Sequence, residues 1–284
     1  MTGSHARQPT APGHEEDDAQ LTAAEITRIA DALESLCERL DQLGAVFSAG
    51  VGSDQALAES PSFDYVGFAE RFRGSRTEIR ERQSHYAALF HGRRHVVDLA
   101  CGRGEFVELL CEQDVGILGV DRSAEMVEAC AGRDLPVIQA DVFAYMDAQA
   151  EKSLDGIASF QFIEHLAPSQ ILRLLLLAER TLIDGAPIVL ETVNPSCPEA
   201  FGDFYLDPTH VRPVPPGLLV YLFERANLRV ESVRFTAPAR DGPMEKVLRV
   251  APYGQADTAA YRDYAVVGAR APRRSRRENF STRD

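Results

Sequence analysis

Cysteine is scarce in this sequence, and its spacing argues against a disulfide framework. The 284 residues include five cysteines, an odd number with no C-x-x-C pair. Small secreted domains that depend on disulfides have many cysteines, usually in even number. We therefore expect a protein of a reducing compartment.

Long apolar runs are also absent. The longest, ILRLLLLA, is interrupted by Arg173, whereas a membrane-spanning helix needs about 20 apolar residues in succession. The N-terminal segment MTGSHARQPTAPGHEEDD is polar and lacks the apolar core of a signal peptide. These absences predict a soluble, cytoplasmic protein.

Positive charge is in the minority. Lysine and arginine number 30 against 43 aspartates and glutamates, so the formal net charge is −13. This charge repels the phosphate backbone of nucleic acid, which makes nucleic acid an unfavourable partner. The basic cluster RRSRR at 273–277 is interpreted as part of a solvated tail over residues 272–284.

The N-terminal third has its own organisation. Polar composition predicts disorder over residues 1–18. A helix is expected over 19–50, because apolar residues recur at alternating intervals of three and four, the spacing of a coiled coil. These residues are Ile26, Ile29, Leu33, Leu36, Leu40, Leu43 and Phe47. The pattern predicts a homodimer, and the alternative is a helix packed on its own domain. A linker and a helical cap are expected over 51–92, with short helices at 62–73 and 76–90.

Residues 93–271 alternate between apolar runs of strand length and helical patterns. Such alternation predicts an α/β fold, in which a Rossmann-like, mostly parallel sheet has helices on both faces. Strands are expected at 95–100, 116–121, 136–140, 154–160, 187–192, 228–238 and 264–271. The helical patterns include residues 169–184 and 215–227. We interpret residues 93–271 as one domain.

The segment HVVDLACGRGEF has the composition of a ligand-binding loop. Asp98 stands at the carboxyl end of the first expected strand, where α/β sheets bind ligands. Gly102 and Gly104 allow the backbone to pass close to a ligand. Asp121, at the end of the second strand, can accept hydrogen bonds from the hydroxyls of a ribose. Glu105 would repel a pyrophosphate at this helix N-terminus. The pattern therefore favours a nucleoside without phosphate, such as S-adenosylmethionine.

Four segments carry a resemblance to a known family. VVDLACGRGEF, GVDRS, QADVFAYM and LDGIASFQFIEHL resemble, in order and spacing, the successive motifs of class I S-adenosylmethionine-dependent methyltransferases. The resemblance covers roughly residues 93–192. It implies a seven-stranded sheet whose last strand is antiparallel, with S-adenosylmethionine as cofactor and methyl transfer as the reaction.

The resemblance also implies roles for individual residues. The glycine loop would face the methionine part of the cofactor, Asp121 would hold the ribose, and Asp141 with Val142 would flank the adenine. Gln161 would lie where the fourth strand opens onto the methyl group. An arginine before the first strand can pair with the cofactor carboxylate. The predicted cofactor-binding set is Arg73, Asp98, Ala100, Gly102, Gly104, Asp121, Asp141, Val142 and Gln161. Alternatively, Asp141 is a helix N-cap and Asp98 fixes the glycine loop.

Two further segments resemble a narrower group. FRGSRTEIRERQSHY (72–86) and ETVNP…FYLDPTHVRPVPP (191–216) are similar to segments of methyltransferases encoded with bacterial polysaccharide machinery, including those that cap O-antigen chains. The mycobacterial enzymes that methylate mannose oligosaccharides are related in activity. This resemblance implies methyl transfer to a sugar hydroxyl.

Residues 193–216, after the fifth expected strand, form a candidate substrate loop. A loop of about twenty residues in a compact domain usually has a function, and its polar side chains suit a polyhydroxylated ligand. We expect substrate contacts from Tyr205, Asp207 and Arg212. The alternative is a proline-braced cover without substrate contact.

Methyl transfer to an alcohol requires removal of the hydroxyl proton. His165 is the candidate base because imidazole titrates near neutral pH, and Glu164 beside it completes the candidate catalytic pair. Alternatively, Glu191 and His210 hold Mg²⁺, which acidifies the hydroxyl, or His165 is a buried structural residue.

An amine acceptor would need no strong base, so a small-molecule N- or O-methyltransferase is the rival function. A scaffolding subunit is disfavoured because the full motif set is present.

Overall fold

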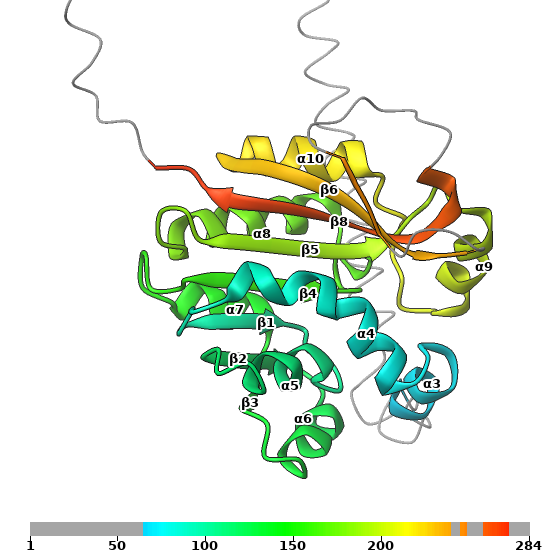
Figure 1. Ribbon diagram of the computed structural model, residues 1–284, viewed down its shortest axis with the longest axis horizontal. Coiled ribbons are helices and arrows are strands. Elements are labelled where there is room, and N and C mark those ends of the chain that lie inside the picture. The colour runs from blue at the N-terminus through cyan, green and yellow to red at the C-terminus, as the bar shows by residue number, and fades with distance from the viewer. Residues whose placement is uncertain (1–64, 240–244, 249–257, 273–284) are drawn as a thin grey trace, which may run out of the picture. The chain divides into compact units, whose positions relative to one another are not determined.

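The described residues of this computed structural model are 65–239, 245–248 and 258–272. They belong to one compact unit over residues 64–284, which Figure 1 shows in colour. The expected disordered segment, the coiled-coil helix over 19–50 and the basic cluster at 273–277 lie outside the described residues. The homodimer therefore stays a prediction.

Eight strands form a single sheet in this part of the chain. They are β1 (Val96–Leu99), β2 (Ile117–Asp121), β3 (Val137–Gln139), β4 (Gly156–Phe160), β5 (Pro187–Val193), β6 (Leu228–Pro238), β7 (Glu245–Leu248) and β8 (Tyr261–Arg270). Their order is β3-β2-β1-β4-β5-β8-β6-β7. β1 to β5 pair in parallel, and β8 is antiparallel to both β5 and β6. The α/β fold and the late antiparallel strand are confirmed. The described sheet has eight strands instead of the expected seven, because β7 pairs with the outer edge of β6.

Helices connect the strands and cover the sheet. They are α3 (Tyr65–Phe72), α4 (Arg76–Ala87), α5 (Glu105–Cys111), α6 (Ala124–Ala131), α7 (Val142–Ala148), α8 (Pro168–Thr181), α9 (Pro198–Leu206) and α10 (Pro216–Arg225). Short 3-10 turns lie at η1 (Ala88–Phe90), η2 (Ile163–His165) and η3 (Thr258–Ala260). The helices expected at 62–73 and 76–90 correspond to α3 and α4.

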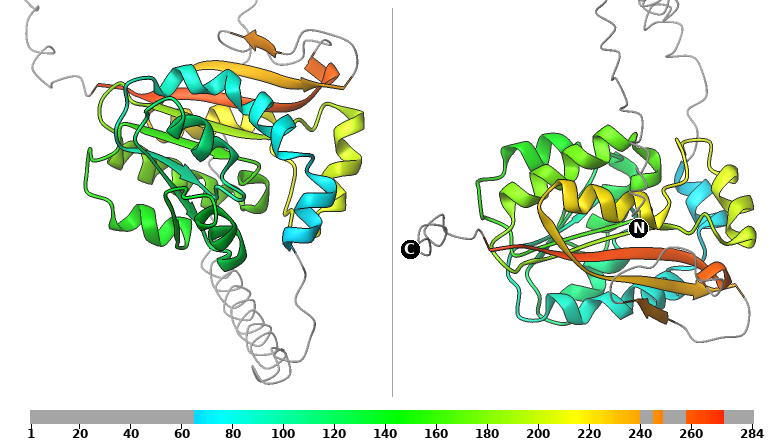
Figure 2. Two further views of the ribbon diagram at one scale, coloured as in Figure 1. Left: turned by 60° about the horizontal axis from the view of Figure 1, so that its bottom comes forward. Right: turned by 90° about the horizontal axis from the view of Figure 1, so that it is seen from above.

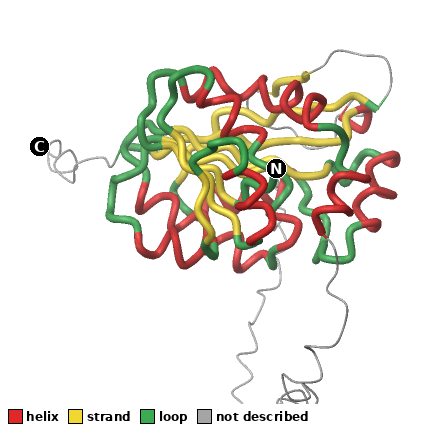
Figure 3. The backbone as a smooth tube through the Cα atoms, turned by 90° about the horizontal axis from the view of Figure 1, so that it is seen from below, coloured by secondary structure: helices red, strands yellow, loops and turns green. Residues whose placement is uncertain are grey.

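Two apolar cores lie on opposite faces of the sheet, because successive side chains of a strand point to opposite sides. Val97 and Ile188 belong to the core that α7, α8 and α10 cover, whereas their neighbours Val96 and Val189 belong to the core under α4 and α5. Figure 2 shows α10 and α4 on opposite sides of the sheet. In Figure 3 the strands run between the two helical layers.

Local sequence explains where several helices begin. Ser75 caps α4 through a capping box, in which its hydroxyl accepts from the Glu78 amide while the Glu78 carboxylate accepts from the Ser75 amide. Pro168, Pro198 and Pro216 each stand in the first turn of a helix, where a missing N–H costs nothing. The prediction of an irregular loop over 193–216 was wrong in part, because Pro198 begins α9 within it.

No helix in the described part of the chain is both long and apolar enough to span a membrane.

Candidate active site

A cavity of about 600 Å³ lies at the carboxyl ends of β1, β4 and β5, between α3, α4 and the segment around α9. Ligands bind at this edge of open α/β sheets. Most of the predicted site residues line it, namely Arg73, Asp98, Ala100, Gly102, Gln161, Glu164, Glu191, Asp207 and His210. The remaining predicted residues are not among the lining residues: Gly104, Asp121, Asp141, Val142, His165, Tyr205 and Arg212. The lining residues of the glycine loop form one wall, here called the cofactor half, namely Asp98, Ala100, Cys101, Gly102, Arg103 and Glu105. The opposite wall, the acceptor half, consists of Gln161, Glu164, Glu191, Asp207, His210 and Asp263.

The glycine loop has left-handed backbone at Ala100, Gly102 and Gly104, with φ of 57°, 53° and 74°. This conformation is strained for Ala100, because a Cβ is disfavoured there. A Cβ on Gly104 would lie 2.9 Å from the Cys130 sulfur, whereas a Cβ on Gly102 would meet nothing within 4 Å. Gly104 is thus required for packing against α6, and Gly102 is the glycine that leaves room at the cavity.

Asp121 holds this loop in place. One of its carboxylate oxygens accepts a hydrogen bond from the Gly102 amide at 2.8 Å, and the other accepts from the Ser123 amide at 2.9 Å. Each oxygen has a further lone pair, so these bonds leave capacity for ribose hydroxyls. Its role as a ribose ligand stays a prediction.

Asp98 is a buried carboxyl at the end of β1, with 2% of its surface exposed. Its Oδ1 is buried and has no hydrogen-bond partner among the described residues. Burial raises the pKa of Asp98 well above its ordinary value, and the charges of Glu105 and Asp121 raise it further. A cation beside Asp98 would offset this cost, because an opposite charge favours the ionised form. S-adenosylmethionine carries an ammonium and a sulfonium, so this wall fits it.

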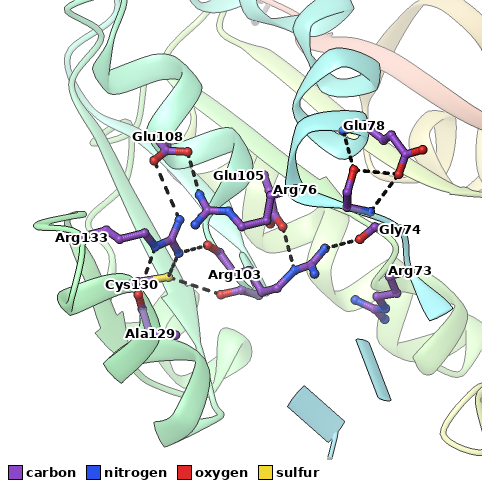
Figure 4. A network of polar contacts seen from close by, with 12 residues as sticks. Arg73, Gly74, Arg76, Glu78, Arg103, Glu105, Glu108, Ala129, Cys130 and Arg133 are labelled. Atoms are coloured by element: carbon purple, nitrogen blue, oxygen red, sulfur yellow. Dashed lines mark hydrogen bonds and ion pairs between the residues drawn. The ribbon is translucent and has the colours of Figure 1, made fainter. Parts of the chain in front are cut away.

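Arginines join the α3–α4 segment to the glycine loop (Figure 4). Arg103 donates to the Gly74 carbonyl at 3.1 Å and pairs with Glu105 at 2.8 Å. Arg133 in turn donates to the Arg103 carbonyl. This network positions the α3–α4 segment as a side of the cavity.

Arg73 lies between the two halves of the cavity. It lines the cavity, and its Nη2 is 3.8 Å from Asp207 Oδ2. Arg80, a second arginine ahead of β1, pairs instead with Glu108 of α5 and with Glu112, the residue after that helix. Arg73 is therefore the one of these two arginines that is placed to meet a ligand.

Asp141 and Val142 stand at the start of α7. The Asp141 carboxylate accepts from the amides of Phe143 and Ala144, both at 2.9 Å, and so forms an N-cap. Val142 is buried in the core. The contacts of Asp141 are those of a helix N-cap, which was the alternative interpretation. The adenine-binding role of Asp141 and Val142 stays a prediction.

Glu191 lies at the centre of a buried polar group in the acceptor half. Its Oε2 accepts from the Tyr86 hydroxyl at 2.7 Å. Burial raises the pKa of Glu191 to about 8, with a further contribution from the charge of Asp263. Asp263 also accepts from the Gln161 amide at 3.1 Å. The Tyr86 and Asp263 partners come from distant segments, and neither was predicted from the sequence.

Glu164 lies on the η2 turn that follows β4, and its side chain is fully buried. Its Oε2 accepts from the Thr192 hydroxyl at 2.8 Å, whereas its Oε1 has no partner among the described residues. Burial raises the pKa of Glu164 to about 7. Glu164, His165 and His210 can each offer a ligand atom, and these atoms lie within 4.8 Å of one another. The structure thus groups His210 with the predicted catalytic pair rather than with Glu191.

The two histidines are held by the segment that follows α9. His165 Nδ1 is 3.2 Å from the Thr209 carbonyl and 2.9 Å from its hydroxyl oxygen. His210 Nδ1 is 2.6 Å from the Phe204 carbonyl. Burial is the largest cause of the lowered pKa of both rings, and the pKa of His165 falls to about 4. Both rings are therefore neutral at neutral pH.

Residues 207–212 are joined to η2 through the backbone. The Val211 amide donates to the Glu164 carbonyl at 2.9 Å. Asp207 lines the cavity, whereas Tyr205 is 68% exposed and neither Tyr205 nor Arg212 lines it. Thr192 and Thr209, which orient Glu164 and His165, were missed in the sequence. The signal that could have identified Thr192 was its position directly after Glu191 in the segment ETVNP.

Comparisons with known proteins agree on one family. A family model described as "Methyltransferase domain" matches residues 28–233. Over 102 residues the chain is 32% identical to a trans-aconitate 2-methyltransferase of Acidovorax ebreus (strain TPSY). This match covers 33% of the chain and only 38% of that relative, well under two thirds of its length.

Solved structures show the same fold. A SAM-dependent methyltransferase from Archaeoglobus fulgidus is 29% identical with a TM-score of 0.64, over 73% of this chain and 100% of that one. A possible histamine N-methyltransferase from Thermotoga maritima has a TM-score of 0.56 at 16% identity, over 72% of this chain and 96% of that one.

Proposed function

Because the chain belongs to the methyltransferase domain family and has the fold of S-adenosylmethionine-dependent methyltransferases, we propose that it methylates a hydroxyl group of a saccharide. The observation that carries this proposal is the polar acceptor half of the cavity. Its wall offers amide, carboxyl and imidazole groups from Gln161, Glu164, Glu191 and His210. Such a wall can hydrogen-bond several hydroxyls of one ligand, whereas an apolar metabolite would leave these groups without partners.

The charge of the cavity disfavours a polyanionic acceptor. Among the described lining residues, eight carboxyl groups outnumber four arginines. The carboxyl groups are those of Glu78, Glu81, Asp98, Glu105, Glu164, Glu191, Asp207 and Asp263, and the arginines are Arg73, Arg82, Arg103 and Arg262. The raised pKa values of Asp98, Glu164 and Glu191 leave five of these carboxyls ionised at neutral pH, which still outnumber the four arginines. Like charges repel a bound polycarboxylate, so aconitate, the compound named for the Acidovorax relative, suits this cavity less well than a neutral sugar.

The cofactor half would hold S-adenosylmethionine. Asp98 would hold the ammonium group, Arg73 the carboxylate and Asp121 the ribose. Asp141 and Val142 would lie toward the adenine. When bound, the cofactor supplies a methyl group on a sulfonium, open to in-line displacement.

The acceptor half would receive the hydroxyl and its proton. Glu164 presents a buried carboxylate oxygen without a partner at this wall, which is the position a proton acceptor requires. His165 belongs to the same turn but does not line the cavity, and its ring contacts Thr209. Asp207 and Arg212 would bind the body of the saccharide. The exposed ring of Tyr205 would stack on a sugar outside the cavity.

An acceptor panel tests the proposed function. Formation of S-adenosylhomocysteine would be measured with methyl glycosides and short oligosaccharides, with histamine and other amines, and with trans-aconitate. We expect turnover with a saccharide and a product whose methyl group is on oxygen by mass spectrometry and NMR. Turnover only with an amine would support the rival small-molecule N-methyltransferase instead.

The heptad pattern supports a homodimer. Burial of seven apolar side chains per chain contributes roughly 1.5–3 kcal/mol each before entropic costs. A variant without residues 1–50 should sediment as a smaller species than the full chain. If the shortened protein still sediments as the same number of chains as the full protein, the interface lies outside residues 1–50.

A further inference from the structure

Three side chains with metal-ligating atoms converge at one end of the acceptor half. Glu164 and His165 come from the η2 turn after β4, and His210 comes from the segment after α9. A carboxylate oxygen and one nitrogen from each ring all lie within 4.8 Å of one another. The two imidazole rings are in contact, with centroids 4.6 Å apart.

Hydrogen bonds determine which nitrogen of His165 carries the proton. Its Nδ1 lies 3.2 Å from the Thr209 carbonyl, which can only accept, so Nδ1 is the donor. The Thr209 hydroxyl donates its own hydrogen to Asp207 at 2.6 Å and therefore also accepts at the ring. Nε2 of the neutral His165 ring therefore has a lone pair that no described residue occupies.

His210 is held in the same tautomer. Its Nδ1 lies 2.6 Å from the Phe204 carbonyl and must donate to it. The ring also packs against the Phe204 ring, with centroids 4.6 Å apart. Nε2 again keeps its lone pair, and its distance of 3.7 Å to Asp207 Oδ2 is too long for a hydrogen bond. Metal-ligating histidines commonly donate their other ring N–H to a carbonyl or carboxylate in this way.

Glu164 supplies an independent sign of a missing partner. The residue has no exposed surface, and its Oε1 is buried without a hydrogen-bond partner among the described residues. The other oxygen is held by the Thr192 hydroxyl at 2.8 Å. An unpartnered buried carboxylate oxygen is costly, and a cation beside it removes that cost.

We propose that Glu164, His165 and His210 bind a divalent ion of the zinc class, such as Zn²⁺ or Co²⁺. Two imidazole nitrogens and one carboxylate are a donor set that suits these ions, whereas Mg²⁺ prefers oxygen ligands. The sequence predicted a magnesium site formed by Glu191 and His210. The site proposed here also uses His210, but its carboxylate is Glu164 and its ion is of the zinc class.

The geometry leaves coordination positions open on the cavity side. Zinc bonds of about 2.0–2.2 Å imply ligand atoms roughly 3.4 Å apart in a tetrahedron, whereas one ligand atom of each side chain lies within 4.8 Å of the others here, so the three side chains would move closer together on binding. Glu164 and His210 line the cavity. This catalytic consequence rests on the proposed function: with the ion bound, Glu164 is a ligand instead of the proton acceptor, an acceptor hydroxyl on the ion would lose its proton more easily, and the proton would pass to solvent.

Metal binding can be measured without any substrate. Chelator-treated full-length protein would be titrated with Zn²⁺ by calorimetry, and with Co²⁺ by visible absorption in the d–d region. We expect one ion whose affinity falls at least 10-fold to 100-fold in Glu164→Gln and in His210→Gln. His91→Gln changes an exposed histidine outside the cavity and should bind as the wild type does. Far-UV circular dichroism with chelator present would verify that each variant is folded.

Two results would overturn the site. One is unchanged Zn²⁺ and Co²⁺ binding in both site variants, and the other is displacement of Co²⁺ by Mg²⁺ at equal concentration. The proposed function fails separately: absence of turnover with every saccharide, while the variants lose the ion as expected, contradicts the saccharide acceptor and leaves the metal site supported.

Discussion

The two halves of the cavity are assembled over different distances along the chain. The cofactor half is held by Asp121, which accepts from Gly102, 19 residues away, and from Ser123, two residues away. In the acceptor half, Tyr86 reaches Glu191 across 105 residues. The first half is a strand–loop–strand motif with nearby partners. The second exists only because separate elements meet at one edge of the sheet.

The chemistry of the two halves differs accordingly. The cofactor half presents left-handed backbone and the buried Asp98 carboxyl, which suit a nucleoside with a cationic group. The acceptor half presents the neutral His210 imidazole and the Glu164 oxygen that has no partner among the described residues, which suit a neutral ligand whose proton must be removed. A short local motif can thus specify a cofactor, whereas the acceptor site depends on how distant segments pack.

The largest expected effect is on catalysis through the acceptor half. Glu164→Gln keeps the size of the side chain and removes its charge, so we expect turnover to fall by about 10²–10⁴, the range for loss of a general base. The S-adenosylmethionine Kd should stay within about twofold, because Glu164 lies outside the glycine loop. Glu81→Gln is the matched control, since Glu81 lines the same cavity but is exposed. An equal loss of turnover in Glu164→Gln and Glu81→Gln would contradict the separate catalytic role of the acceptor half.

The next effect concerns the cofactor half alone. Asp121→Ala removes the acceptor of the Gly102 and Ser123 amides, each within 2.9 Å. Loss of one charge-assisted hydrogen bond costs about 1.5–3 kcal/mol, so S-adenosylmethionine should bind roughly 10-fold to 100-fold more weakly by calorimetry. Zn²⁺ affinity should not change in this variant. A tighter-binding Asp121→Ala protein would contradict the assigned role.

A smaller effect should appear in the pH dependence of stability. Glu191 titrates at 4.5 ordinarily, and burial raises its pKa to about 8 in the folded protein. The stability it contributes is complete below about pH 4.5 and is lost as the pH rises through 8. Glu191→Gln has no such loss and can still accept from Tyr86. The melting temperature of the variant relative to wild type should therefore increase from pH 5 to pH 9. A difference that is constant with pH would show that Glu191 is already ionised in the folded protein at low pH.

The smallest effect separates the two interpretations of Asp141. Asp141→Ala removes an N-cap that accepts from two amides, which should lower the free energy of unfolding by about 1 kcal/mol. Asp141→Ser should restore most of it, because serine also caps helices. Urea denaturation measures both values. If both variants also bound S-adenosylmethionine more weakly, the adenine role would be supported.

The sequence by itself determined the scaffold and the cofactor loop. Val96 and Val97 lie in a short apolar run that is typical of a buried strand, and the glycines after them permit the left-handed turns seen at Gly102 and Gly104. These are local properties of the chain, so the five parallel strands and the edge of the sheet that binds ligands could be predicted. The strand β7 was missed because it is only four residues long, and the helix α9 was missed because its proline-rich segment was interpreted as a loop.

Tertiary structure decided how the acceptor half is composed. Thr209 lies 44 residues from His165, and only the path of the chain through α9 and back to η2 brings them together. That path also brings His210 beside Glu164 and leaves Glu191 with Tyr86 instead. The raised pKa of Glu164 and the lowered pKa of His165 have the same origin, because burial is the largest cause of each shift. Burial depends on all the elements packed around a residue, and this information is not contained in the spacing of residues along the chain.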